Sequence, residues 1–129
     1  VFAMMDGKQR KMALLGKSRG EQGTKTVALS DKKHGLPGIP VSELSSDQKG
    51  QVRKTMADLL AMFREKDAKE ALKMVDAGGF DHLHLAFYKN HDVGNDKIWD
   101  VWQIEGPNCL WFFRGDPHVH AWVNIKSPA

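Results

Sequence analysis

The chain has 129 residues, of which 41% are hydrophobic and 27% charged, and these values are typical of one globular domain. Its only cysteine is Cys109, which excludes an internal disulfide and any Cys-x-x-Cys zinc or redox motif. No apolar run is long enough to cross a membrane, so we expect no membrane partner. Because the sequence opens with VFAMMDG, we expect it to be a processed piece of a longer chain.

The net charge of +3 is unevenly distributed along the chain. Residues 1–35 hold eight Lys/Arg against three Asp/Glu, and the remainder holds eleven against thirteen. A basic segment can meet phosphate or an acidic surface, or it can simply be a solvated face. The absence of aromatic residues interleaved with these charges favours the solvated face, so nucleic acid is an unlikely partner.

The amino-terminal third is predicted to be a helix followed by an irregular segment. Met5, Met12 and Leu15 have near-helical spacing, although Gly7 weakens the helix. Glycine and proline then dominate as far as Pro40, with room for a short strand over 26–29. We predict that residues 1–35 form a basic helix plus a Gly-rich loop acting as an arm or linker, and that residues 36–129 form an α+β domain.

Two helices are predicted in the middle of the chain. Ser45 and Gln48 have the spacing of a capping box, and the apolar residues behind them recur on one helical face. These residues, which we expect in the core, are Val52, Met56, Leu59, Leu60 and Phe63. A second helix is expected over about 67–76 and stops at the Gly78-Gly79 pair.

After Gly79 the hydrophobic period changes from about 3.6 to 2 residues, as expected for strands. The four predicted strands cover 80–88, 97–105, 109–114 and 118–125, and short turn sequences join the last three. We therefore predict an α+β fold in which two or three helices pack on one face of an antiparallel sheet of about four strands.

Four of the six histidines occur as two His-x-His pairs in the predicted strands, namely His82, His84, His118 and His120. Residues i and i+2 of a strand share a face. The apolar residues between them must meet the helices, so both pairs are expected on the opposite face of the sheet. Imidazoles about 6.5–7 Å apart at the backbone can lean together to bind one cation.

The histidine pairs predict a transition-metal site with an open position, in which copper or zinc is favoured over iron and magnesium is disfavoured. Two alternatives stay open. The pairs could be hydrogen-bonded polar residues on a partly wet face, or a pH-responsive cluster. His34 and His91 lie in loop-like sequence and are not expected to be ligands.

Other residues are weaker candidates for chemistry. Glu105 is the candidate acid or base and, like Asp116, a candidate additional ligand or hydrogen-bond partner of an imidazole. Arg114 is the candidate anchor for an anionic substrate, although a strand-end arginine is often only solvated. Cys109 lies in an apolar strand and is not expected to be a reactive thiolate.

The four tryptophans, Trp99, Trp102, Trp111 and Trp122, are concentrated in the predicted strands. We expect some of them on the sheet face away from the helices, as a platform for a small molecule or glycan or as a second buried layer. A second copy of the chain or a segment upstream of Val1 could cover that layer.

The motifs WQIEGP (102–107), FRG (113–115) and PHVH (117–120) resemble those of proteins from planctomycete-like bacteria. These proteins fall in or near the family catalogued as domain of unknown function thirty-five hundred. The resemblance covers roughly residues 36–125 and includes the helix around Gln48. It implies a carboxy-terminal portion of a longer, exported protein, and hence a periplasmic or secreted location. The more usual ending of the family is a Gly-His-His turn, so the site geometry is expected to differ here.

Three functional hypotheses follow, in order of preference. The first is an extracytoplasmic metalloprotein with a multi-histidine site, in which copper or iron would support oxidative chemistry and zinc the hydrolysis of a substrate. The second is a binding or interaction module that uses tryptophans and histidines without a metal. The third is a structural or nucleic-acid-binding part that uses the basic arm.

Overall fold

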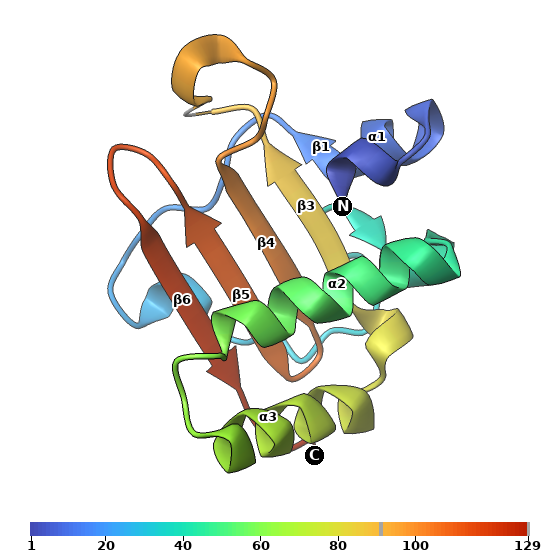
Figure 1. The fold of residues 1–129 in the computed structure, drawn as a ribbon, viewed down its shortest axis with the longest axis vertical. Coiled ribbons are helices and arrows are strands. Elements are labelled where there is room, and N and C mark those ends of the chain that lie inside the picture. Colours follow the sequence, from blue (N-terminus) through green and yellow to red (C-terminus); the bar gives the residue numbers. More distant parts are fainter. Residues whose placement is uncertain (91, 129) are drawn as a thin grey trace.

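The computed structural model describes residues 1–90 and 92–128, and the expectation for His91 lies outside this range. The fold is α+β, as predicted, with helices packed on a mixed sheet (Figure 1). The elements are α1 (Gly7–Ala13), β1 (Leu14–Leu15), β2 (Ile39–Pro40), α2 (Ser46–Leu59), α3 (Glu65–Gly78), β3 (His84–Tyr88), β4 (Val101–Gly106), β5 (Cys109–Arg114) and β6 (His120–Ile125). No helix within the described residues is long and apolar enough to span a membrane.

Within the described residues the sheet has six strands, more than the sequence predicts. Strands β3 to β6 form the expected antiparallel meander. Two strands of two residues each were not expected. Strand β1 pairs parallel to β3, and β2 pairs antiparallel to it. Both lie at the β3 edge, so β6 is the other edge of the sheet (Figure 1).

One face of the sheet carries the apolar side chains that meet α2 and α3. Leu83, Leu85 and Val123 lie on this face and pack in one cluster with Val52 and Met56 of α2. Trp111 lies at the centre of the cluster and is fully buried. The apolar alternation of the strands therefore identified the helix-facing side of the sheet correctly.

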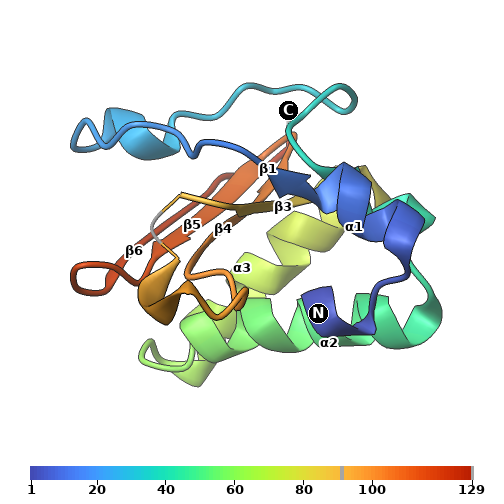
Figure 2. The ribbon, with the colours of Figure 1, turned by 90° about the horizontal axis from the view of Figure 1, so that it is seen from above.

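The opposite face of the sheet is covered by residues 16–35, which we call the strap (Figure 2). The strap holds a 3₁₀ turn over Lys25–Val27 in place of the short strand expected at 26–29. Val27 is buried against Leu110 and Phe112, and its carbonyl oxygen accepts a hydrogen bond from Asn124 at 2.9 Å. The segment predicted to be an arm or linker is packed on the sheet.

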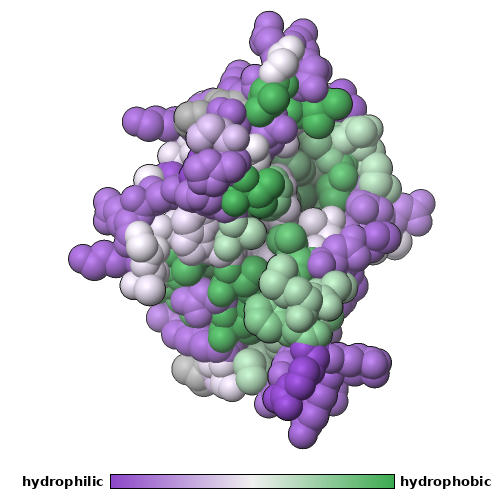
Figure 3. Space-filling model, turned by 60° about the vertical axis from the view of Figure 1, so that its left-hand side comes forward, coloured by the Kyte–Doolittle hydropathy of each residue, from purple (hydrophilic) through white to green (hydrophobic). Residues whose placement is uncertain are grey.

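The capping box predicted for the first of the two central helices is formed at the start of α2. Ser45 accepts a hydrogen bond from the backbone amide of Gln48, whose side chain accepts one from the amide of Ser45. The helix ends before Phe63, which lies in the following turn and is 55% exposed rather than buried in the core. Figure 3 shows apolar side chains gathered on the side of the molecule where this turn approaches β6.

Candidate metal centre

The two histidine pairs lie at opposite corners of the sheet. His84 of β3 is aligned, through β4 and β5, with Asn124 of β6. His120 of β6 is aligned in the same way with Tyr88, at the other end of β3. Three strand spacings and four residues of strand therefore separate His84 from His120, a distance of about 20 Å. One mononuclear site cannot hold both pairs, which corrects the prediction that the two pairs contribute to one metal site.

The pair His82 and His84 does not have the predicted strand geometry. His82 lies in a 3₁₀ turn (Phe80–His82), so the two side chains do not alternate along one strand. The His84 ring is buried and its Nδ1 lies 3.0 Å from the carbonyl oxygen of His82, where a protonated Nδ1 donates. The His82 ring instead packs edge-on against His34, with the centroids 5.6 Å apart. Nδ1 of His84 is thus engaged by backbone, which supports the hydrogen-bonded alternative for this pair.

His84 should make stability depend on pH. Burial lowers its pKa, and the nearby His34 and His82 lower it further, against the opposing effect of the hydrogen bond to His82. The unfolded state then binds more protons below the ordinary histidine pKa of about 6.5, so the free energy of unfolding falls as pH drops from there through the folded pKa. We expect His84→Asn, which keeps a side-chain donor, to lose less stability than the wild type between about pH 7 and pH 5. Urea unfolding at several pH values measures this, with His118→Asn as the control; equal pH slopes in all three proteins would contradict it.

The other corner brings together Glu21, Arg114, His118 and His120, which we call the corner cluster. His120 opens β6, Arg114 is its partner at the end of β5, and His118 precedes β6. The Nε2 atoms of His118 and His120 are 2.7 Å apart. Glu21 reaches the cluster from the strap, with Oε2 3.2 Å from Nδ1 of His120. The two carboxylate oxygens of Glu21 also accept hydrogen bonds from Nε and Nη2 of Arg114.

The charges in this corner determine which imidazole nitrogen is available. The hydrogen bonds from Arg114 hold the pKa of Glu21 below its ordinary value, so the carboxylate is ionised at neutral pH. An ionised Glu21 can accept a hydrogen bond from Nδ1–H of His120, which leaves Nε2 unprotonated and directed at His118. In this tautomer Nη2 of Arg114, 2.6 Å from Nδ1, has to move away, because both groups are then donors. In the other tautomer Nδ1 accepts from Nη2 of Arg114, 2.6 Å away, and Nε2–H donates to His118. Only the first tautomer can bind a cation at Nε2.

Glu105 is not placed to act as the predicted acid or base. Its side chain is only 6% exposed, and Oε1 lies 3.1 Å from Nη2 of Arg19 and 3.2 Å from Nε2 of Gln103. Arg19 belongs to the strap and also donates to the carbonyl oxygen of Thr26 at 2.8 Å. Glu105 therefore forms an ion pair with Arg19 that attaches the strap to the sheet. The strap also shields the Glu105 carboxylate from solvent, so it is not accessible to a substrate.

The three tryptophans in the strands do not form an exposed platform on the sheet, and Trp99 lies in the loop before β4. Trp102 and Trp111 belong to the core on the helix side, and Trp122 lies under the strap. The chain thus covers both faces of its own sheet. Burial also raises the pKa of the Cys109 thiol to about 12, in agreement with an unreactive buried cysteine.

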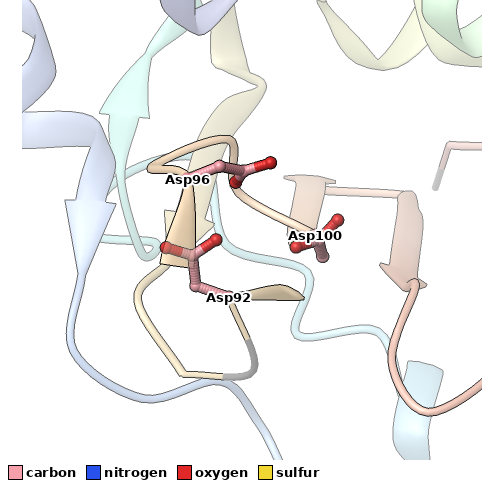
Figure 4. A group of neighbouring side chains, drawn as sticks. All are labelled: Asp92, Asp96 and Asp100. Atoms are coloured by element: carbon pink, nitrogen blue, oxygen red, sulfur yellow. The ribbon is translucent and has the colours of Figure 1, made fainter. Parts of the chain in front are cut away.

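A group of carboxylates that the sequence reading missed lies in the loop before β4 (Figure 4). Oxygens of Asp92, Asp96 and Asp100 lie within 4.8 Å of one another. Among the described residues, no other group of three or more Asp, Glu, His or Cys side chains brings its ligand atoms so close together. Each carboxylate accepts a hydrogen bond from a backbone amide of the same loop, at 2.7–3.1 Å. The D-x₃-D-x₃-D spacing in the sequence could have indicated this group. The hydrogen bonds to backbone amides show that the three carboxylates stabilise the loop.

Comparisons of the chain with protein-family models, with curated proteins and with solved structures found no match. The resemblance to the family of unknown function therefore stays a prediction. Any functional conclusion depends on the geometry described above.

Proposed function

We propose that this protein binds a transition-metal ion through Nε2 of His118 and Nε2 of His120. The observation that carries the proposal is the convergence of these two nitrogens with an ionised carboxylate, Glu21, on the far side of one ring. A histidine that binds a metal commonly donates a hydrogen bond from its other ring N–H to a carboxylate, which fixes the tautomer and orients the ring. Glu21 is suited to this role toward His120.

The distance between the two ligand nitrogens needs only a small change to accept an ion. Metal–nitrogen distances are about 2.0–2.1 Å, so two ligands of one tetrahedral ion lie slightly further apart than the 2.7 Å seen between the Nε2 atoms. His118 is exposed and free to make this movement. Two imidazoles favour copper(II) or zinc over iron and leave positions for water or another ligand. With zinc the site would activate water, and with copper it would support oxidative chemistry.

Arg114 supports an anionic molecule as the additional ligand. Its guanidinium donates to both oxygens of Glu21 and to the carbonyl oxygen of Asp116, and lies against Nδ1 of His120, so one N–H of Nη1 remains for an anion. We propose that Arg114 assists binding of an anion next to the metal, and that the protein acts in the periplasm or outside the cell. The location is supported by the family resemblance alone.

Metal titration tests the proposal directly. Untagged protein should bind about one copper(II) or zinc ion by calorimetry and elemental analysis, and His118→Ala/His120→Ala should lose this binding. The matched control is His34→Ala/His82→Ala, which removes two neighbouring histidines at the other corner and should retain it. Glu21→Gln should weaken binding about ten- to hundredfold. Equal binding by the two double variants would contradict the proposal and favour the metal-free binding module.

A further inference from the structure

A basic cleft of about 530 Å³ lies beside the β3 edge of the sheet, outside the corner cluster. Three parts of the chain supply its cations. Arg10 and Lys11 come from α1, Lys89 follows β3, and Lys97 belongs to the loop before β4. The remaining lining residues are Phe2, Ala3, Leu14 and Trp99. Among residues 1–90 and 92–128, no carboxylate lines the cleft.

The lysines of the cleft, Lys11, Lys89 and Lys97, form no direct ion pair with an acidic side chain within residues 1–90 and 92–128. The aspartates of the adjoining loop accept hydrogen bonds from backbone amides, including that of Lys97 itself. Four positive charges gathered around the hollow repel one another, and the carboxylates of the adjoining loop offset only part of this repulsion because they do not pair with the lysines. An anion bound in the hollow would relieve the rest.

Arg10 is oriented by its contacts at the edge of the cleft. Its Nε and Nη2 donate to the carbonyl oxygens of Phe2 and Ala3, at 3.3 and 3.1 Å. Of the five N–H groups of a guanidinium, three remain for a ligand. Because two hydrogen bonds already fix the group, little side-chain entropy would be lost when an anion binds.

Two aromatic rings form the apolar part of the same cleft. Phe2 and Trp99 meet edge to face, with their centroids 5.9 Å apart, and Leu14 lies beside them. Aromatic walls next to several cations suit a molecule that has both a planar ring and a multiply charged anionic group. The volume is within the range of ordinary small-molecule sites.

We propose that this cleft binds a small phosphorylated molecule that carries an aromatic ring, of about the size of a nucleotide. A phosphate is favoured over a carboxylate because cations approach from three separate elements, and a phosphate offers three acceptor oxygens at different angles. The ring lies against Trp99 while the phosphate meets the lysines, and Phe2 supports this arrangement by packing against Trp99 and under the guanidinium of Arg10. This site does not depend on the proposed metal function.

Binding of adenosine 5′-monophosphate (AMP) to the whole chain tests the inference, with adenosine and inorganic phosphate as partial ligands and a chelator present to exclude metal at the corner cluster. Calorimetry should show AMP binding more tightly than either partial ligand. Lys89→Glu/Lys97→Glu should weaken AMP binding about tenfold or more, since hydrogen bonds to charged groups are lost. Trp99→Leu should weaken it about tenfold through lost stacking.

The control variant is Lys66→Glu/Lys73→Glu, which makes the same change of charge at two exposed lysines of α3, away from the cleft. It should bind AMP like the wild type. Equal weakening in both double variants would reduce the effect to overall charge and overturn the proposal. Adenosine or phosphate binding as tightly as AMP, or no binding of AMP by the wild type, would also overturn it.

Discussion

Replacing Glu105 with alanine is expected to destabilise the protein by about 3 kcal/mol, at the lower end of the range for breaking a buried ion pair. The change leaves the guanidinium of Arg19 without its carboxylate and Nε2 of Gln103 without its acceptor, beneath the strap. Arg19 is 24% exposed, so water compensates for part of the loss. Denaturant unfolding measures the effect.

Two further variants separate the ion pair from simple loss of packing. Glu105→Gln keeps an acceptor oxygen for Arg19 and should be destabilised less than Glu105→Ala. Arg19→Met/Glu105→Leu removes both charges together and should recover most of the lost stability, since apolar replacements of a buried pair are often neutral or better. A double variant as unstable as Glu105→Ala would show that the loss is one of shape and not of charge.

Replacing Gly38 with alanine is expected to reduce stability by about 3 kcal/mol or more, from the combined cost of left-handed backbone and overpacking. Gly38 has φ 96°, and an added Cβ would lie 2.2 Å from the carbonyl oxygen of Leu85. That atom belongs to the paired backbone of β3, so it cannot move aside as a side chain would.

Gly35 provides a matched control for Gly38. It also has a positive φ, of 72°, but a Cβ added there meets nothing within 4 Å. Gly35→Ala should therefore cost only about 1 kcal/mol, from the backbone conformation alone. Thermal or urea unfolding compares the two variants, and equal losses would contradict the role of the close approach to Leu85.

The parts of the fold predicted from sequence are those with a local signal. The capping box at Ser45, the glycine stop after α3 and the alternation in β3 to β6 all depend on residues a few positions apart. Strands β1 and β2 have only two residues each and exist because they add to the edge of β3, so no periodicity could show them. The strap also has no hydrophobic periodicity, because its position is determined by contacts with distant strands and not by a local pattern.

The candidate site was predicted in part. Alternation correctly placed His84 and His120 on the face away from the helices. It could not give the distance between them, because that depends on strand order and register across three pairings. Glu21 and Arg19 were not singled out, since a charged residue in a glycine-rich stretch has the same local pattern whether it is solvated or meets a partner some 90 positions away.

The two ends of the strap are attached to the same strand, and this has a consequence for dynamics. Since β1 and β2 both pair with β3, the strap can lift as one unit while the β3–β6 meander stays intact. Lifting would separate Arg19 from Glu105 and Glu21 from His120 in a single step. A ligand that binds best when Glu21 orients His120 would therefore slow amide hydrogen exchange throughout the strap, by thermodynamic linkage.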